Sequence, residues 1–349
     1  MSIAFLQTKQ MLVIIQSILW AVFGTILYRE KIVSEGLPRL LGRTLYWFGV
    51  PLQIFFLARR SNFDSIVWLP PIMTIAILIL GLAIATSVVE ILKQFISIVL
   101  TKFTPQNQLE GLFLSVGLSA SLGTRQLIDR ATPKGDLGTG SFVLASILGN
   151  TGFIGLALIP PLIDSNYWSW IVLYGVAHNV LGSYGLGVLI ADYYSYSGGK
   201  NNWQDRLQNL LFLPSLWAFA YGYFSQDIPL PPLLETAISQ AVLFVVPGAF
   251  ILIGMQLSKL QKWQNLSAGI VPTAIKMLVI PGLVGLFLTL LGLSGDRRLV
   301  LVLMSGMPTA FASIILAEEY NLDRQIAASS ILLSTLFLPL SLFIWLKIF

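Results

Sequence analysis

Two apolar stretches, one in each half of the chain, decide the fold because polar and helix-breaking residues interrupt both. The first reads Leu144-Ala-Ser-Ile-Leu-Gly-Asn-Thr-Gly-Phe-Ile-Gly-Leu-Ala-Leu-Ile-Pro-Pro161. The second reads Leu303-Met-Ser-Gly-Met-Pro-Thr-Ala-Phe-Ala-Ser-Ile-Ile-Leu-Ala-Glu-Glu-Tyr-Asn321. A bilayer tolerates an interrupted helix only where the freed backbone groups are buried in protein or line a wet cavity. Because such pairs mark the midplane site of secondary transporters, the two stretches predict a transporter.

The composition of the chain indicates an integral membrane protein. Of its 349 residues, 56% are hydrophobic and 11% are charged, and the mean hydropathy is +0.80. Soluble domains carry about 25% charged residues. The chain has no cysteine, which excludes disulfides, thiolate chemistry and cysteine-bound metal. Its first apolar helix lacks a small-residue cleavage site, so we expect it to be kept in the mature protein.

The apolar runs predict an all-α membrane protein of ten transmembrane helices. Their expected ranges are 10–28, 37–58, 70–92, 140–161, 167–191, 207–224, 233–257, 268–292, 297–318 and 326–347. A polar, glycine-rich linker over 193–206 separates a first five-helix repeat (1–192) from a second (207–349). Because five is odd, the two repeats must have opposite orientations, which is the inverted-repeat arrangement.

The basic residues predict the orientation of the chain in the membrane. Fourteen lysines and arginines fall on the side of the linker and six on the side of the termini, while Lys276 lies within a helix. Positive residues prefer the cytoplasmic side, so we expect a multi-pass protein of the plasma (inner) membrane with both termini outside. The net charge of +5 follows from this topology, and no basic-aromatic motif suggests nucleic acid as a partner.

One connector does not fit a transmembrane pattern. It covers residues 94–138 and includes the apolar run 109–118, which is too short to span a bilayer and carries Glu110. We expect an interfacial, amphipathic piece on the cytoplasmic side, with a re-entrant segment as the alternative.

The fourth predicted helix supplies the first half of a candidate site. Gly149, Gly152 and Gly155 weaken it, since glycine costs about 1 kcal/mol against alanine in a helix. Asn150 and Thr151 place an amide and a hydroxyl at the expected break. If the helix unwinds there, the second half-helix presents free N–H groups and a positive dipole end, which suit an anion.

The ninth predicted helix supplies the second half. Pro308 removes a backbone donor and disrupts the preceding turn, and Thr309 and Ser313 stand beside it. Substrate-binding candidates are therefore Asn150, Thr151, Gly152, Gly155, Pro308, Thr309 and Ser313. The other interpretation is that these small residues serve close helix packing, with hydroxyls bonded to their own backbones.

Five further polar residues at helix depth are candidates for lining the cavity: Gln53, His178, Asn179, Gln256 and Lys276. Lys276 could face a substrate anion or a buried acid, or its side chain could snorkel to the membrane surface. His178 is either a proton-linked group or a packed, hydrogen-bonded core residue. No carboxylate stands beside either break, which weighs against an obligate proton relay at the site itself.

Enzyme signatures are missing from the chain. It has no His-Glu-x-x-His pattern and no phosphate-binding Gly-x-x-x-x-Gly-Lys-Ser/Thr loop, and its single histidine is too few for a histidine metal cluster. We therefore expect no catalytic residues, no metal site and no cofactor. Transport would be secondary or facilitated, with H⁺ or Na⁺ as an open choice of coupling ion.

These segments resemble the auxin efflux carrier family, which includes the plant PIN proteins and bacterial relatives. The most specific part is Pro308 followed by Ala317-Glu-Glu-Tyr-Asn321 and a final helix that carries Leu338-Pro-Leu340. The run Asn150-Thr-Gly-Phe-Ile-Gly155 resembles the fourth-helix motif of the family, and Lys276 with Pro281 resembles its eighth-helix pattern. The short linker is similar to that of bacterial members.

The resemblance implies two inverted five-helix repeats whose fourth and ninth helices are broken and cross, as in bile-acid sodium symporters. It implies a scaffold of helices one, two, six and seven, a moving domain of the other helices, and a homodimer through the scaffold. It also implies that an organic anion is carried at the crossing by elevator-like alternation.

The chain departs from the family pattern at two places. A proline that family members often have two residues beyond Gly155 is replaced by Ala157, and a later ninth-helix proline is replaced by Ser313. We therefore expect the breaks to be milder, or shifted by a turn.

The leading hypothesis is a secondary transporter of a small organic anion, most simply a carboxylate, in the lipid bilayer. The alternatives are a membrane receptor or regulatory protein that binds without translocating, a sodium-coupled organic-anion symporter, and a passive channel.

Overall fold

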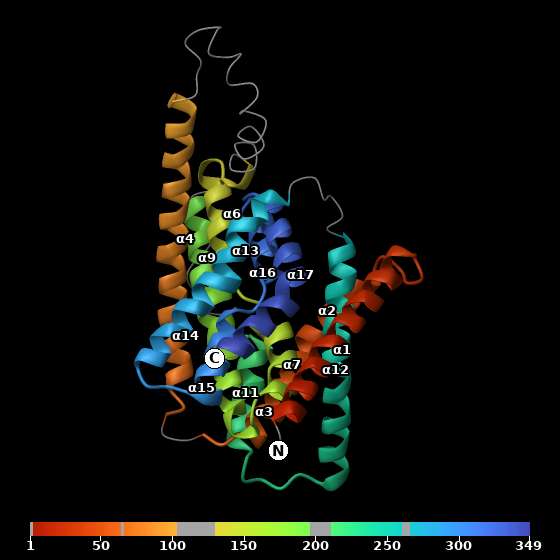
Figure 1. Ribbon diagram of the computed structural model, residues 1–349. Helices are drawn as coiled ribbons and strands as arrows, with labels where there is room; N and C mark the ends of the chain where they lie inside the picture. The colour runs from red at the N-terminus through yellow and green to blue at the C-terminus, as the bar shows by residue number, and fades with distance from the viewer. Residues whose placement is uncertain (1–2, 64–65, 103–129, 196–210, 260–265) are drawn as a thin grey trace.

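The structure, a computed structural model, describes residues 3–63, 66–102, 130–195, 211–259 and 266–349. Within these residues every regular element is a helix, and the backbone adds a single isolated bridge. The helices run along one long direction, and both termini lie in the lower half of the view (Figure 1). The described part of the chain therefore has the all-helical architecture that the apolar runs predict.

The described α-helices follow one another as α1 (Ile3–Arg29), α2 (Leu37–Thr44), α3 (Val50–Arg60), α4 (Leu69–Lys102), α6 (Gly135–Ile147), α7 (Leu156–Leu158), α8 (Trp168–Ala177), α9 (Gly187–Tyr194), α11 (Pro214–Phe224), α12 (Pro232–Lys259), α13 (Ser267–Ala274), α14 (Ile280–Leu290), α15 (Gly295–Ser305), α16 (Ala312–Glu319) and α17 (Arg324–Ile348). Wider π-helical turns join several of them: η1 (Leu45–Gly49), η2 (Thr151–Gly155), η5 (His178–Leu186) and η7 (Ile275–Val279). Two short 3₁₀ turns, η3 (Pro160–Leu162) and η4 (Ser165–Tyr167), connect α7 to α8.

Seven helical segments of the described chain are long and apolar enough to cross a membrane: Met11–Arg29, Leu37–Arg60, Leu69–Phe95, Ser165–Tyr194, Pro232–Ser258, Ser267–Leu290 and Arg324–Ile348. Three further segments of the expected ten differ in form. The fourth and ninth are interrupted, and α11, in the sixth, begins at Pro214, with residues 196–210 outside the described residues. Integral membrane character is thus supported, and ten crossings stay a prediction.

Two expected boundaries need correction. Helix α4 continues to Lys102, so the first part of the connector 94–138 is helical. The expected interfacial run 109–118 lies outside the described residues. Helix α9 ends at Tyr194, so the first two residues of the expected linker 193–206 belong to a helix, because the apolar, aromatic sequence continues the last turn.

The helices pack as two groups. In the first group, α1 lies along α12, and α3 packs on α11 and α12. In the second, α4 packs on α6 and α8, α13 on α17, and α14 on α15. Figure 1 shows α1, α2 and α12 on the right and α4, α9 and α14 on the left. The groups meet where α3 contacts α8 and where α12 contacts η2 and α7.

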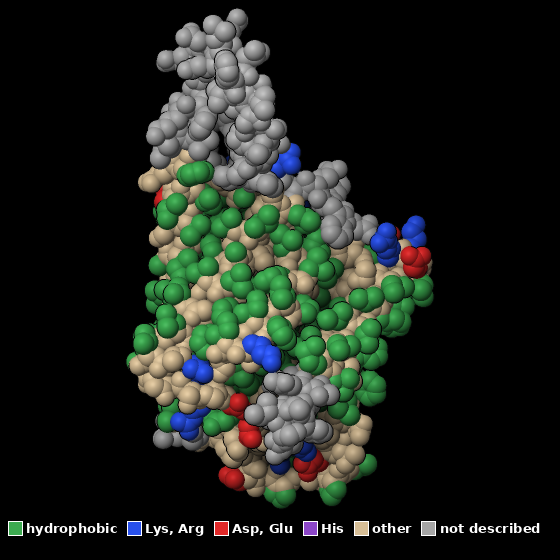
Figure 2. All heavy atoms as spheres, in the orientation of Figure 1, with side chains coloured by type: hydrophobic (Ala, Val, Ile, Leu, Met, Phe, Trp, Pro, Cys, Tyr) green, Lys and Arg blue, Asp and Glu red, His purple; other side chains and the backbone are tan. Residues whose placement is uncertain are grey.

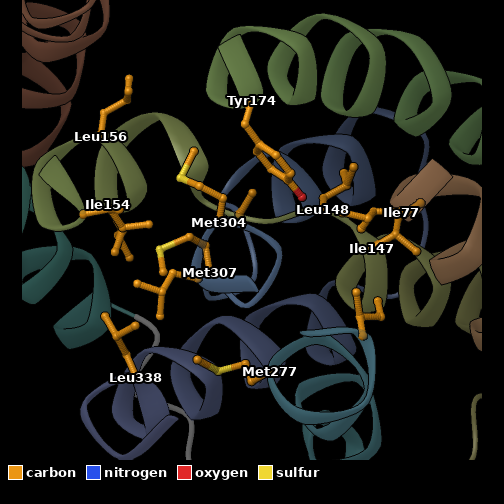
Figure 3. Close-up of a cluster of buried hydrophobic side chains, with 14 of the residues drawn as sticks. Ile77, Ile147, Leu148, Ile154, Leu156, Tyr174, Met277, Met304, Met307 and Leu338 are labelled. Carbon is orange, nitrogen blue, oxygen red and sulfur yellow. The ribbon is translucent and has the colours of Figure 1, made fainter. Parts of the chain in front are cut away.

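Most of the fully buried core belongs to the second group. Trp170, Tyr174 and Phe142 are among its largest side chains with less than 2% exposure. Figure 3 shows Met304 and Met307 among aliphatic neighbours below Tyr174. Unbranched methionines fill irregular space, which suits a core built around interrupted helices.

The outer surface matches a bilayer. Figure 2 shows hydrophobic side chains over the middle of the visible face and most charged side chains towards its two ends. Large apolar side chains such as Phe48, Phe244 and Leu290 are exposed. An apolar belt between charged ends is the surface expected of a protein that faces lipid.

Candidate functional site

The two interrupted helices cross and pair with each other through their backbones. Helix α6 ends at Ile147 and η2 begins at Thr151, while α15 ends at Ser305 and α16 begins at Ala312. Between these ends, Gly149 and Thr309 form an antiparallel bridge. The pairing satisfies backbone groups that each break removes from its helix.

Two backbone hydrogen bonds make this bridge. The amide of Asn150 donates to the carbonyl of Pro308 at 2.7 Å, and the amide of Ala310 donates to the carbonyl of Leu148 at 2.8 Å. Each donor and its acceptor belong to opposite halves of the chain. The crossing is therefore held by direct contacts between segments that are far apart in sequence.

The amides of the two bridge residues are satisfied by side chains from the last helix of each half. The Gly149 amide donates to Nε2 of His178 at 3.3 Å. The Thr309 amide donates to Oγ of Ser334 in α17 at 3.0 Å. Both acceptors are buried, so they complete the hydrogen bonding of the crossing from inside the protein.

The carbonyls that end α6 and α15 also find side-chain donors. The hydroxyl of Thr309 donates to the carbonyl of Ala145 at 2.9 Å. Nζ of Lys276 donates to the carbonyl of Ser305 at 2.7 Å. Helix carboxyl ends leave carbonyls without intrahelical donors, so these two contacts cap the two first half-helices.

Asn150 holds the start of the second half-helix and keeps a donor free. Its Oδ1 accepts from the amide of Phe153 at 3.2 Å, which is a helix N-cap. Its backbone carbonyl accepts from the amides of Ile154 and Gly155. Within the described chain, its Nδ2 forms no hydrogen bond, and the residue lines a cavity. The amide nitrogen can therefore donate to a ligand.

That cavity lies against the crossing and has a volume of about 470 Å³. Its lining combines both halves of the chain and both groups of helices. The lining residues are Tyr46, Trp47, Val50, Gly149, Asn150, Gly152, Phe153, Asn179, Val180, Ser183, Tyr184, Val188, Phe212, Leu213, Ser215, Ala310, Phe311, Ala312, Ile315, Leu316, Glu319 and Tyr320. Its size is that of a small-molecule site.

The chemistry of the cavity is mostly apolar and aromatic. Uncharged polar groups come from Asn150, Asn179 and the serines, and the exposed Glu319 stands at the end of α16. The hydroxyls of Tyr46 and Tyr184 are 2.8 Å apart and join η1 of the first group to η5 of the second. Among the described lining residues there is no lysine, arginine or histidine.

The structure brings some of the predicted binding and cavity-lining residues together at this cavity, but not all. Asn150, Gly152 and Asn179 line the cavity. Thr151 is buried, and its hydroxyl has no hydrogen-bond partner among the described residues. Gly155 packs on Met304, because a Cβ there would lie 3.1 Å from its sulfur.

The three predicted residues of the ninth helix lie outside the cavity lining. Pro308 supplies its carbonyl to Asn150, Thr309 caps α6, and the hydroxyl of Ser313 donates to the carbonyl of Ala310 at 2.8 Å. Their polar groups therefore serve the crossing itself. This is the packing interpretation that the sequence left open for hydroxyls beside a break.

The other candidates for lining the cavity lie outside its lining. Gln53 donates to the carbonyl of Leu156 at 2.6 Å, and Gln256 is half-buried away from the lining. His178 is a buried hydrogen-bonded residue. Lys276 does not snorkel, because it is only 1% exposed and its amine is bonded inside the protein.

Sequence reasoning missed the aromatic residues of the cavity. Tyr46, Tyr184 and Phe311 are ordinary residues of apolar helices by sequence, and only their meeting at the crossing makes them a site. Helical spacing could have indicated Ser183 and Tyr184. They follow Asn179 by about one turn, so they lie on the same face of the helix as that predicted residue.

Comparisons with known proteins find similarity to membrane transport proteins. Residues 207–346 match a family model described as "Membrane transport protein". A protein named "uncharacterized transporter" from Methanocaldococcus jannaschii is 24% identical over 216 residues, which cover 59% of this chain and 67% of that protein. Another of that name, from Methanothermobacter thermautotrophicus, is 25% identical over 212 residues, with the same coverage.

Interrupted helices that cross beside a cavity, in a chain that is similar to these proteins, support a membrane transporter. The matches further support a membrane transport family of the auxin efflux carrier type, as the resemblance predicted. That family is generally not enzymatic.

Proposed function

We propose that this protein is a secondary transporter that carries a small organic anion, a carboxylate in the simplest case, through the cavity at the crossing. The observation that carries this proposal is the position of Asn150. Its Oδ1 is used by the helix cap, its Nδ2 forms no hydrogen bond among the described residues, and the residue lines the cavity. A carboxylate is the complementary acceptor.

The helix ends around the cavity favour the same charge. Asn150 and Gly152 stand at the amino end of the η2–α7 segment, and Ala310 and Ala312 stand at that of α16. Two positive dipole ends at one cavity stabilise a negative group. The apolar and aromatic remainder of the lining suits a ligand with a hydrophobic body.

The proposed mechanism is elevator-like alternating access. The cavity is lined by η1, α3 and the segment before α11 on one side, and by the crossing and η5 on the other. A cavity between two packed groups changes its open side when one group slides against the other. We propose α1–α3, α11 and α12 as the scaffold and the remaining helices as the moving part.

The larger architecture belongs to the same proposal. We propose ten crossings as two inverted five-helix repeats, 1–192 and 207–349, joined by the linker over 193–206. A homodimer through the scaffold in the plasma membrane would fix one group while the other moves. Exchange measured under an H⁺ gradient and, separately, under a Na⁺ gradient identifies the coupling ion.

The test is counterflow in proteoliposomes. The panel contains mono- and dicarboxylates, including indole-3-acetate, benzoate and succinate. Asn150→Asp keeps an oxygen for the N-cap but replaces the free donor with a negative acceptor. We expect near-normal thermal stability and a loss of apparent anion affinity of tenfold or more, on the order of one charged hydrogen bond.

The control is Asn166→Asp, which adds the same charge at an exposed loop position and should leave exchange unchanged. Unchanged anion affinity in Asn150→Asp would contradict the proposed site. Saturable binding without flux would favour the receptor, and flux without saturation would favour a channel. Wild-type exchange that strictly needs a sodium gradient would select the sodium-coupled symporter.

A further inference from the structure

Lys276 is a buried amine with no acidic partner among the described residues. It lies in η7, is 1% exposed, and bonds to the carbonyl of Ser305 at 2.7 Å. The salt bridges between Arg60 and Glu235 and between Lys93 and Glu90 lie on the surface. A lysine buried at membrane depth is costly and usually functional.

The end of the Lys276 side chain occupies the space that a side chain at position 149 would fill. A Cβ built on Gly149 would lie 2.9 Å from both Cε and Nζ of Lys276. Gly149 is not among the residues with positive φ in the described chain, so its backbone would accept another residue. Glycine is needed at this position for space, because the amine fills the place of the missing side chain.

Thr309, the other residue of the bridge, has a side chain at the position where Gly149 has none. Thr309 faces Gly149, and its hydroxyl caps α6 at Ala145, one turn before Gly149. Lys276 caps α15 at Ser305, one turn before Thr309. The two caps are equivalent in position, but one is a neutral hydroxyl and the other is an amine supplied by a different helix.

The difference between the two caps is an ionisable amine beside a residue of the cavity wall. Gly149 lines the cavity, and the place of its missing Cβ lies 2.9 Å from the lysine amine. No described lining residue is itself a lysine, arginine or histidine. Charges interact several times more strongly in a protein interior than in water, so this amine can act on a ligand without touching it.

We infer that Lys276 is a positioning residue that supplies, from beside Gly149, the positive charge that holds a carboxylate in the cavity. This inference rests on the proposed anion transport for its electrostatic part. Its geometric part states that the amine of Lys276 fills the space of a side chain at position 149. This part is independent of any substrate. The two parts have separate measurements.

The geometric part is tested by a double-variant cycle of thermal unfolding. Gly149→Thr should lower the apparent Tm by about 5 °C or more, because its side chain collides with the lysine amine. Lys276→Leu should also lower it, since the Ser305 carbonyl loses its donor. The double variant should recover much of the loss, because the introduced threonine hydroxyl can then cap Ser305 as Thr309 caps Ala145.

The matched control is Gly42→Thr in α2, where a Cβ would meet Leu252 at an ordinary 3.7 Å. Gly42→Thr should change the Tm little, both in the wild-type protein and in Lys276→Leu. Losses that simply add in the double variant would show that position 149 and Lys276 do not share one space, and would overturn the placement.

The electrostatic part is tested with the double variant, whose fold is restored but whose charge is gone. Exchange of indole-3-acetate, benzoate and succinate is compared with binding of their neutral amides. Wild-type protein should prefer the anion, and the double variant should lose this preference by tenfold or more, with a larger change in KM than in maximal rate.

A double variant that keeps the full preference for the anion would overturn the role of the charge. Wild-type protein that exchanges none of the carboxylates would overturn the proposed function, and the electrostatic role with it. In that case the double-variant cycle of thermal unfolding still tests whether the amine of Lys276 occupies the space beside Gly149.

Discussion

At the residue scale, polar side chains beside the breaks divide into groups that hold the crossing and groups that face the cavity. Thr309 and Ser313 use their hydroxyls on backbone carbonyls, whereas Asn150 uses one atom for the helix and leaves the other free. A residue can thus stand at the right depth and still contribute only to structure.

Thr309→Val is the corresponding prediction. It removes the hydroxyl that donates to Ala145 and leaves a buried carbonyl without that donor, so we expect a loss of about 1–3 kcal/mol in stability. Apparent substrate affinity should stay close to that of the wild type. Thermal unfolding and counterflow of the same preparations measure both.

The control for this substitution is Thr335→Val in α17, whose hydroxyl bonds only to Ile331 of its own helix and should matter little. A large loss of affinity in Thr309→Val at unchanged stability would return Thr309 to the binding site.

At the element scale, the first group of helices depends on close contact between α1 and α12. A Cβ built on Gly254 would fall on the backbone of Ala21, and one built on Gly24 would fall on the backbone of Ile251. Side-chain bonds from Thr25 and Ser258 cross the same contact. Small residues that let two backbones approach are the usual means of helix association in lipid.

Gly254→Leu should therefore separate the two helices. We expect a destabilisation of about 3 kcal/mol or more, seen as a lower apparent Tm and a lower yield of folded protein. The same substitution at Gly248, also in α12, meets only the side chain of Leu45 at 3.5 Å and should be tolerated. Equal losses at both positions would mean that α1 and α12 are not in backbone contact.

At the scale of the whole molecule, the arrangement of loops predicts which side each end faces. The loop after α1 carries Ser34, and the loop between α11 and α12 carries Asp227; both residues are exposed. The distribution of basic residues predicts that the first loop is cytoplasmic and the second is outside. The absence of cysteine from the chain makes single-cysteine labelling free of background.

We expect an impermeant maleimide to label Ser34→Cys only from the cytoplasmic side and Asp227→Cys only from the outside. Ser183→Cys, on the cavity wall, should be labelled from the cytoplasmic side, because Glu319 and Tyr320 place the cavity next to the loop that follows α16. The reverse pattern at the two loop positions would invert the proposed topology, and labelling of Ser183→Cys only from outside would invert the proposed opening.

Much of the fold could be predicted from sequence, because membrane helices are local. The interruption around Asn150 and Pro308 was visible as glycine, proline and polar residues inside apolar runs, and the structure places the breaks there. Helix ends shifted where apolar sequence continued, as in α4. The number of crossings and the inverted repeats remain predictions.

The candidate site was predictable only in part. Asn150, Gly152 and Asn179 could be found from their neighbours in sequence, but Tyr46 and Tyr184 meet only because two groups of helices pack together. The sequence did not distinguish a snorkelling Lys276 from a buried one, since that depends on the space left by Gly149 in a different helix.

What the sequence determined by itself is the membrane-spanning, helical character of the chain and the places where two helices must break. Both follow from hydropathy and backbone propensity, which act within about 20 residues. Only the tertiary structure decided the pairing of the two breaks, the shape of the cavity and the burial of Lys276. Those features depend on contacts between residues far apart along the chain, where packing and hydrogen bonding select the partner.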